Sequence, residues 1–351
     1  MTDAQIGVKH PPLAELLAQF LNAWAQFDAS PVALDVSESM EETECAVNAF
    51  LLLNRWADNP VAEAIAAQFP EMAERRCAVP DEVFIDRLAQ APCLVPLTSA
   101  MAPHAAADLP KTCSARAVLA GWLAFAWSQA LTRLGRQDLC ALVLSRQPAS
   151  RIASHWVRLG NQQPPDGGDS VLFRYQDPRV MQRMWPSLTA GQRLRWLGPV
   201  EHWYALAHPW GPMPTMEQPQ WFHAQRPAEP VPIDRQGSRF DSNQWHAMRA
   251  WAPANRIWRD YEDHGVAAGD QPDAQTMAQL LRDAAGLGLT GASAEDYVQC
   301  TWLHEKRDEG ASRVLDWAQP ANARLLKRIQ AALAAEPQAR FASLFHLFTR
   351  G

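Results

Sequence analysis

The sequence lacks the cysteine pattern of a zinc or disulfide protein. Six cysteines are scattered over 351 residues, and none of them belongs to a CxxC pair or to a Cys/His spacing that resembles a zinc site. Cys140 lies in the apolar string LCALVL, where cysteine behaves as a small hydrophobic residue. This usage fits a reducing cytoplasm best, and we expect neither a metal ion nor a cofactor.

Export and membrane-spanning segments are also missing. The N-terminus has no basic start followed by an apolar run, as a signal peptide would. The longest apolar string, residues 117–131, is too short to cross a bilayer comfortably and contains Ser128 and Gln129. We therefore expect a cytoplasmic protein without membrane insertion, in which this string forms a buried helix.

Lysine and tyrosine are scarce. Arginine supplies most of the 32 basic residues, and the net charge of −6 argues against nucleic acid as a partner. Tryptophan is frequent, with 15 residues against 4 tyrosines. We expect most tryptophans to pack in the core, while any exposed ones would favour protein binding.

The usual catalytic motifs do not occur. The chain has no P-loop, no GxSxG elbow and no HExxH helix. Gly286, Gly288 and Gly291 spell GxGxxG, but a helical pattern precedes them, whereas a dinucleotide site needs a strand there. We interpret these glycines as a helix end, and the sequence nominates no catalytic residue.

Strand-like and helix-like segments alternate in the first part of the chain. Apolar strings predict buried strands at 47–53, 92–97 and 139–145, and helical patterns predict helices at 60–69, 117–134 and 148–160. The spacing of apolar residues from Leu13 to Trp24 predicts an amphipathic N-terminal helix that packs against the domain. We predict an α/β lobe over residues 1–206, with a mixed sheet flanked by helices.

The second part of the chain has a different sequence pattern. Residues 207–239 are rich in proline and show no periodicity, so we predict a linker or strap. Residues 240–351 have helical spacing and predict a mainly α-helical C-terminal lobe. Within it, Ser293 followed by Asp296 is typical of a helix cap. The apolar C-terminal string FASLFHLF either docks on a lobe or binds a partner.

The stretch at 170–203, SVLFRYQDPRVMQRMWPSLTAGQRLRWLGPVEHW, is the most informative part of the chain. Residues 171–176 alternate as on a pleated strand. Asp177 before Pro178 predicts a helix start, because the carboxylate accepts from a free N–H and proline needs no donor in the first turn. Gly198-Pro199 ends the following segment, and a second strand follows it.

Asp177 also has charged neighbours. Arg174 and Arg179 flank it and are placed either to bridge to it or to bind an anion. A catalytic role for Asp177 would need a base such as His202 or His208, which lie six residues apart. We interpret Asp177 as a helix cap.

The same stretch resembles the type VI secretion adaptor family. That family shows a strand reading like "lfRfyDPRvl", then a helix and an aromatic-rich "fGPv". The segments that match are VLFRYQDPRVMQRMW and LGPVEHW, through Phe173, Arg174, Tyr175, Asp177, Pro178, Arg179, Val180, Gly198, Pro199 and Val200, with Trp203 closing the second segment. Looser likenesses at 90–97 and 150–169 extend the resemblance over about 47–206. A departure is FLLLNRWAD, where the family often has "aLlDgA".

The resemblance implies a non-enzymatic, two-lobed adaptor. Such a chaperone binds a toxin effector, often through a helical and fairly apolar segment, and helps load it onto a VgrG or PAAR spike protein. Two other functions remain open: a hydrolase that uses Asp177 with His202 or His208, and an immunity-type protein that binds and blocks a toxin.

Overall fold

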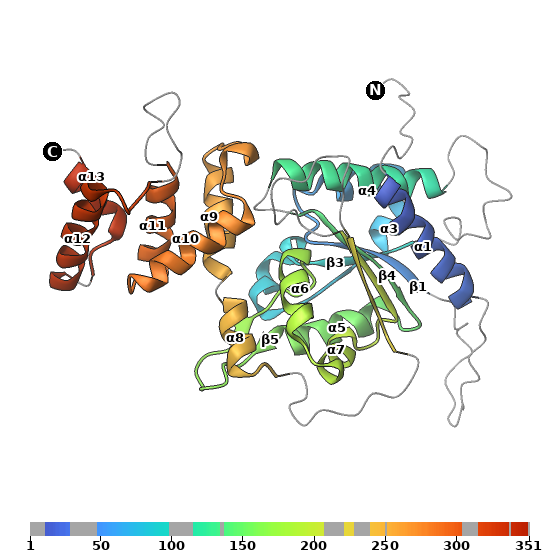
Figure 1. The fold of residues 1–351 in the computed structure, drawn as a ribbon. Helices are drawn as coiled ribbons and strands as arrows, with labels where there is room; N and C mark the ends of the chain where they lie inside the picture. Colours follow the sequence, from blue (N-terminus) through green and yellow to red (C-terminus); the bar gives the residue numbers. More distant parts are fainter. Residues whose placement is uncertain are drawn as a thin grey trace, which may run out of the picture. The chain divides into compact units, whose positions relative to one another are not determined.

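The computed structural model describes residues 11–28, 48–97, 115–133, 137–206, 221–227, 239–249, 251–303, 315–336 and 338–349. These residues form two compact units, one reaching to Met248 and the other starting at Arg249 (Figure 1). The first unit has a sheet with helices on both faces, and the second is helical. The predicted fold class, an α/β lobe followed by a helical lobe, is confirmed.

One six-stranded sheet forms the centre of the first unit. Its strands, in spatial order, are β2 (Cys77–Ala78), β3 (Cys93–Pro96), β1 (Asn48–Leu53), β4 (Leu139–Ser145), β7 (His202–Leu206) and β8 (Trp221–Gln225). Every neighbouring pair among these strands is antiparallel. The predicted strands at 47–53, 92–97 and 139–145 correspond to β1, β3 and β4. β4 is buried along its whole length, as its apolar sequence predicts.

One face of the sheet is covered by the N-terminal helices. They are α1 (Pro11–Asp28), α2 (Pro60–Gln68), α3 (Pro70–Glu74) and α4 (Ala115–Thr132). Leu16, Phe20 and Trp24 of α1 are buried in this core with alternate residues of β1 and β4, which confirms that the predicted N-terminal helix packs on the domain. None of the helices in the described ranges has the length and apolarity that crossing a membrane would require.

A second core lies on the opposite face. The helices there are α5 (Ala149–Gly160), α6 (Pro178–Met184), a short 3-10 turn η4 (Trp185–Ser187), α7 (Ala190–Leu197) and α8 (Ser242–Arg249). Trp156, Trp196 and Trp203 are fully buried in it, and Trp156 and Trp203 lie 5.1 Å apart between ring centroids. Several tryptophans are therefore core residues, as their number predicted.

The stretch at 170–203 departs from its predicted form. The expected strand is only β6 (Val171–Leu172), which pairs with β5 (Asn161–Gln162) outside the main sheet. A turn closes after it, because the Asp177 N–H donates to the Arg174 carbonyl at 2.9 Å. Two helices, α6 and α7, replace the expected single helix, because Thr189 and Gln192 form a capping box that starts a new helix at α7.

The predicted linker at 207–239 was also partly wrong. Residues 221–225 form β8, which extends the sheet by pairing with all of β7. The next residues belong to the first unit as well, since Phe240, Trp245 and Met248 are buried in its second core. Sequence periodicity missed β8, because a five-residue edge strand between prolines offers too few positions to show alternation.

The second unit consists of helices α9 (Ala252–Asp263), α10 (Ala274–Gly286), α11 (Gly291–Leu303), α12 (Pro320–Ala335) and α13 (Phe341–Thr349), with a 3-10 turn η5 (Ala268–Asp270). The GxGxxG glycines link α10 to α11, and Gly288 has a positive φ of 74°, as expected for a helix end. The predicted cap at Ser293 was wrong, because α11 starts at Gly291. Asp296 instead binds Arg340.

Candidate functional site

Most of the residues singled out by the sequence lie inside the first unit. Phe173 and Trp203 are buried in its second core, and Asp177 and Pro178 are buried at the start of α6. Phe173 packs against Phe240 at 5.1 Å between ring centroids. These residues therefore shape the lobe from within and do not themselves form a contact surface.

Asp177 is the centre of a buried polar network. Its carboxylate caps α6 by accepting from the Arg179 backbone N–H at 2.9 Å, as predicted. The same carboxylate accepts from the Arg179 guanidinium, with Nε at 2.9 Å from Oδ1 and Nη2 at 2.5 Å from Oδ2. Burial alone would raise the pKa of Asp177, but the charge and hydrogen bonds of Arg179 outweigh it and hold this pKa at about 2. The carboxylate is thus ionised, and both of its oxygens accept hydrogen bonds.

Asn54, which the sequence did not nominate, joins this network to the sheet. It follows β1, donates through Nδ2 to Asp177 Oδ2 at 3.3 Å, and accepts from Arg174 Nη2 at 2.5 Å. Arg174 also donates to the Asn54 carbonyl at 3.0 Å. The only sequence signal for Asn54 was that FLLLNRWAD, which contains it, departs from the pattern of the family that the chain resembles.

Arginines outnumber carboxylates in this network. Burial lowers the pKa of Arg174, and Asp177 partly offsets this effect. Burial together with the nearby charge of Arg179 lowers the pKa of Arg183 to about 8. The amide of Asn54 adds no negative charge, and the charge of Asp177 opposes the lowering of the pKa values of Arg174 and Arg183. Through Asn54, the network connects the 173–177 turn to the end of β1 by hydrogen bonds.

Arg174 also connects the network to the surface. Its guanidinium lies over the Phe84 ring, 5.4 Å from the centroid, and Phe84 is the buried anchor of the 3-10 segment η1 (Glu82–Gln90). Three apolar side chains on η1 point outward, with Val83 47% exposed, Ile85 66% and Leu88 49%. We call Val83, Ile85 and Leu88 the η1 strip.

Both ends of η1 are held by hydrogen bonds to neighbouring segments. Asp81 caps its start by accepting from the Val83 N–H at 3.1 Å and is itself bound by Asn161 Nδ2 at 2.8 Å. At its end, the Ala89 carbonyl accepts from the backbone N–H groups of Trp56 and Ala57, at 2.9 and 2.7 Å. The η1 strip is therefore a preformed surface on the scaffold, not a loose loop.

The Gly198-Pro199 turn has a structural role in the same unit. Gly198 ends α7 with a positive φ of 57°, and a Cβ there would fall 2.0 Å from the His155 ring. The Pro199 carbonyl accepts from Ser145 Oγ at 2.6 Å, which ties the turn to the end of β4. Only glycine fits this position without displacing His155.

The structure places Asp177 and His202 apart. His202 lies on β7 and bonds through Nδ1 to His223 Nε2 on β8, at 3.1 Å. Its side chain lies on the sheet face of Tyr204, whereas α6 packs on the other face. His208 lies outside the described residues. Among the described side chains, Asp177 bonds to Asn54 and Arg179 and to no histidine.

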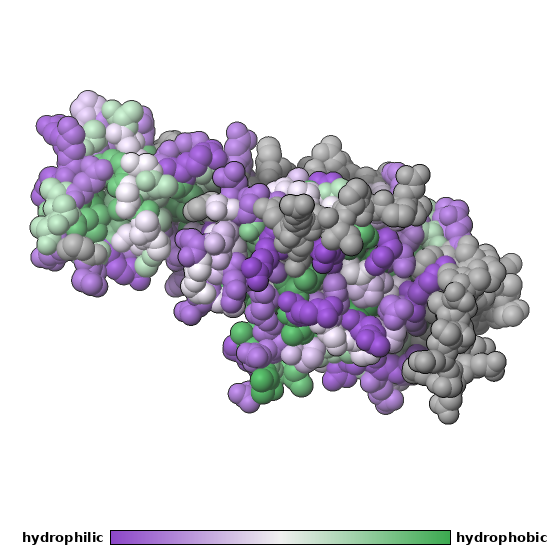
Figure 2. Space-filling view, turned by 90° about the horizontal axis from the view of Figure 1, so that it is seen from below, coloured by the Kyte–Doolittle hydropathy of each residue, from purple (hydrophilic) through white to green (hydrophobic). Residues whose placement is uncertain are grey.

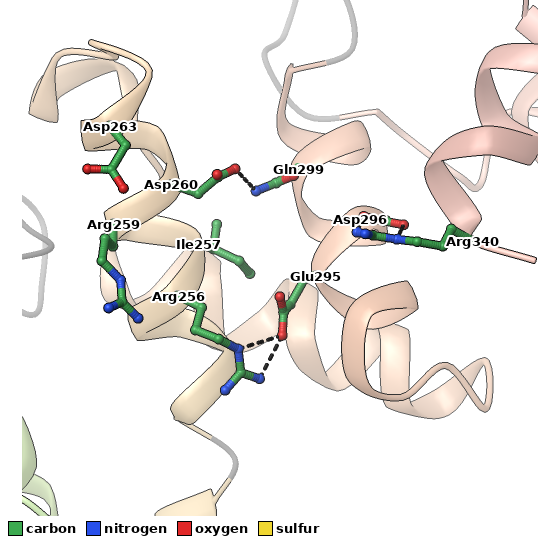
Figure 3. Close-up of a pocket in the computed structure, with 9 residues that line it drawn as sticks. All are labelled: Arg256, Ile257, Arg259, Asp260, Asp263, Glu295, Asp296, Gln299 and Arg340. Atoms are coloured by element: carbon green, nitrogen blue, oxygen red, sulfur yellow. Dashed lines mark hydrogen bonds and ion pairs between the residues drawn. The ribbon is translucent and has the colours of Figure 1, made fainter. Parts of the chain in front are cut away.

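The second unit contains a polar pocket of about 270 Å³ (Figure 3). Its lining comprises Arg256, Ile257, Arg259, Asp260, Asp263, Glu295, Asp296, Gln299 and Arg340. Most of the charges in it are paired across helices: Arg256 reaches Glu295 at 2.6 Å, and Gln299 donates to Asp260 at 2.6 Å. Arg340, which immediately precedes α13, binds the buried Asp296 on α11. These pairs fasten α9, α11 and α13 together.

One comparison with known proteins gives a match. Residues 49–195 match the family model described as "Domain of unknown function (DUF4123)". The DUF4123 match runs from β1 into α7, so it includes η1 and the Asp177 network but not Gly198, Pro199 or Trp203. It covers less than half of the chain and ends before the helical unit. None of the curated proteins and none of the solved structures matches this chain.

Proposed function

We propose that this chain is a non-enzymatic adaptor of the bacterial cytoplasm, which binds a toxin effector and helps load it onto a VgrG or PAAR spike protein. The observation that carries the proposal is the η1 strip, an exposed apolar surface held rigidly inside the DUF4123 match. The DUF4123 match agrees with the resemblance of the 170–203 stretch to type VI secretion adaptors.

An apolar strip of this kind suits protein binding. Hydrophilic side chains predominate on the face shown in Figure 2, and hydrophobic ones form only small groups. Among the described residues, the large hydrophobic side chains that are clearly exposed are Val83, Ile85, Leu88, Phe125 and Leu347. Three of these five lie on one short segment, so η1 has the densest group of exposed apolar side chains in the described part of the chain. Because η1 is preformed, a partner would meet little ordering cost there.

The position of the η1 strip also suggests its partner. It lies in the segment that matches a family model, whereas the helical unit lies outside this match. A surface within the shared segment suits the component that related adaptors would share, which is the spike protein. We therefore assign the η1 strip to the spike and leave the helical unit for the effector, which differs between adaptors.

The test is binding of the full-length chain to the spike protein encoded in the same gene cluster. Ile85→Asp introduces a charge at the centre of the strip, so we expect the dissociation constant for the spike to rise at least tenfold. Phe125→Asp is the matched control, since Phe125 is also an exposed apolar residue of the α/β unit but lies on α4. The wild-type chain binding neither this spike nor the toxin encoded beside it would overturn the proposal.

The same toxin and spike protein also distinguish a loading adaptor from an immunity protein and from a hydrolase. An immunity protein would suppress the toxicity of the neighbouring toxin on co-expression, whereas a loading adaptor leaves the toxin active. A hydrolase would need Asp177 for turnover, and the environment of Asp177 favours a capping role instead. Neutralisation of the toxin without any spike binding would favour the immunity function.

A further inference from the structure

The η1 segment has little structure of its own to fix the direction of its exposed side chains. Of its nine residues, Glu82–Gln90, only Phe84 is buried. The helical backbone is also interrupted at Arg87, which has a non-helical φ of −151° and ψ of 49°. Short 3-10 segments are held weakly by their own hydrogen bonds. Between its two bonded ends, the orientation of η1 therefore depends on what Phe84 packs against.

Phe84 belongs to neither of the two apolar cores of the α/β unit. Its ring instead faces a cation, because the guanidinium carbon of Arg174 lies 5.4 Å from the ring centroid. An arginine over an aromatic face is attracted by the negative charge density of the ring. The buried anchor of η1 thus packs on a charged side chain.

Arg174 is itself held in one orientation. Its Nη2 donates to both the carbonyl oxygen and the Oδ1 of Asn54, at 3.0 and 2.5 Å. Asn54 directly follows β1, so these bonds connect the guanidinium to the central sheet. A guanidinium is planar, and two bonds from one of its nitrogens therefore also fix the plane that it presents to Phe84.

The neighbouring side chains of the same turn have other tasks. Phe173 points into the second core, where it packs on Phe240 and Trp245. Asp177 caps α6. A change at Arg174 should therefore alter the support of η1 and leave the packing of Phe173 in place.

We propose that Arg174 is a positioning residue for the spike-binding surface. Its guanidinium, held by Asn54, supports Phe84 and so sets the direction in which the η1 strip points. Arg174 acts through Phe84 and does not touch the partner. This inference rests on the proposed function, and it adds the residue through which the polar network at the end of β1 supports the surface.

The support affects binding because η1 has to meet its partner in one orientation. A segment that samples several orientations binds with an affinity reduced by the fraction that is competent. Ordering exposed side chains on binding also costs free energy. Loss of Arg174 should thus weaken spike binding even though the residues of the η1 strip are unchanged.

The experiment measures binding of the full-length chain to the spike protein encoded in the same gene cluster. Arg174→Met removes the charge and the hydrogen bonds to Asn54, and we expect the dissociation constant to rise about tenfold. Arg193→Met is the matched control, because the Arg193 guanidinium also lies over a ring, 5.9 Å from the Trp185 centroid, and donates to the Trp185 carbonyl. We expect this control to bind like wild type.

A double-mutant cycle tests whether Arg174 acts through Phe84. Phe84→Ala removes the ring but leaves the partners of Arg174 on Asn54 in place, and it should weaken spike binding by about the same factor. Combining Phe84→Ala with Arg174→Met should then weaken binding little more than either change alone. Effects that simply add would show that the two side chains act independently and would contradict the inference.

Hydrogen exchange gives a readout that needs no partner. The backbone N–H groups of Val83 and Phe84 both donate to Asp81, at 3.1 and 2.9 Å. In Arg174→Met these two amides should exchange severalfold faster, while the amides of β4 should be unchanged. A merely structural role would accelerate exchange in β4 as well. Arg174→Lys keeps the charge but lacks the planar fork, so it should lie between Arg174→Met and wild type in both exchange and binding.

The possible failures are distinct. If Ile85→Asp weakens spike binding but Arg174→Met does not, the inference is wrong while the proposed function stands. If the effect of Arg174→Met disappears at high salt, Arg174 contacts an acidic group of the spike protein directly, and the inference is again wrong. If wild type binds no spike protein, the assignment of the η1 strip to the spike fails, and the inference fails with it.

Discussion

Asp177 has three tasks at once. Its carboxylate caps α6, forms the ion pair with Arg179 and accepts from Asn54 at the end of β1. A group with so many partners is ionised in the folded state, and its pKa lies at about 2 in spite of burial. The residue thus stabilises the turn that carries Arg174 toward η1. Its chemistry is that of a structural anion.

Asp177→Asn should therefore be strongly destabilising. The amide can still cap α6, but it removes the buried ion pair with Arg179, which costs about 3 kcal/mol of unfolding free energy. Urea unfolding at pH 7 measures this loss. Asp166→Asn, in the exposed 164–169 turn, is the control and should be neutral. Equal stability of Asp177→Asn and wild type would contradict the structural role.

The pH dependence of stability gives a second readout of the same residue. Because the folded-state pKa of Asp177 lies below its value in the unfolded chain, its contribution is present above about pH 4. That contribution is lost as the pH falls from about 4 toward 2. The Asp177→Asn variant should lack this part of the acid sensitivity, so its stability deficit should shrink at pH 3.

Strand β8 is the element whose role the structure revealed most clearly. It completes the sheet by pairing along the whole of β7, and Ala224 is buried in the second core. On the other face His223 stacks on Tyr204, with ring centroids 4.1 Å apart, and bonds to His202. Burial, followed by the charge of His202, lowers the pKa of His223 to about 4. A neutral histidine pair thus helps to hold an edge strand.

This pair should make the α/β unit sensitive to mild acid. Folding keeps His223 neutral, whereas an unfolded histidine takes up its proton near pH 6.5, so stability falls as the pH drops from about 6.5 to 4. His223→Gln should flatten this dependence. Urea midpoints at pH 7 and pH 5 provide the measurement, with the exposed His264→Gln as control. An unchanged slope in His223→Gln would show that the pair does not couple to folding.

At the scale of the whole molecule, the chain divides after Met248. Phe240 packs on Phe173 and stacks on Trp196 at 5.3 Å, and Trp245 packs on Phe173 at 5.3 Å. Residues 240–248 therefore complete the core of the α/β unit, although their helical spacing resembles that of the helices that follow. The boundary predicted at 239–240 would cut through this core.

Truncation tests the boundary. A chain that ends at Met248 keeps Phe240 and Trp245, so we expect it to unfold cooperatively. Tryptophan fluorescence during urea unfolding measures this transition. A chain that ends at residue 239 loses both and should be less stable by more than about 3 kcal/mol, since removing a single large buried aromatic already costs that much. Equal stability of the two chains would favour a boundary at residue 239.

The sequence by itself determined the elements that rest on local interactions. The helix starts at Asn59-Pro60 and Asp177-Pro178, the helix end at Gly286–Gly291 and the buried strand β4 follow from capping, backbone conformation and apolar runs within a few residues. Only the tertiary structure decided the direction of each strand, the pairing of β8, the shortening of β6 and the exposure of η1. Those features depend on contacts between residues far apart in the chain, such as Asn54 with Arg174 and Phe173 with Phe240, and no local pattern encodes them.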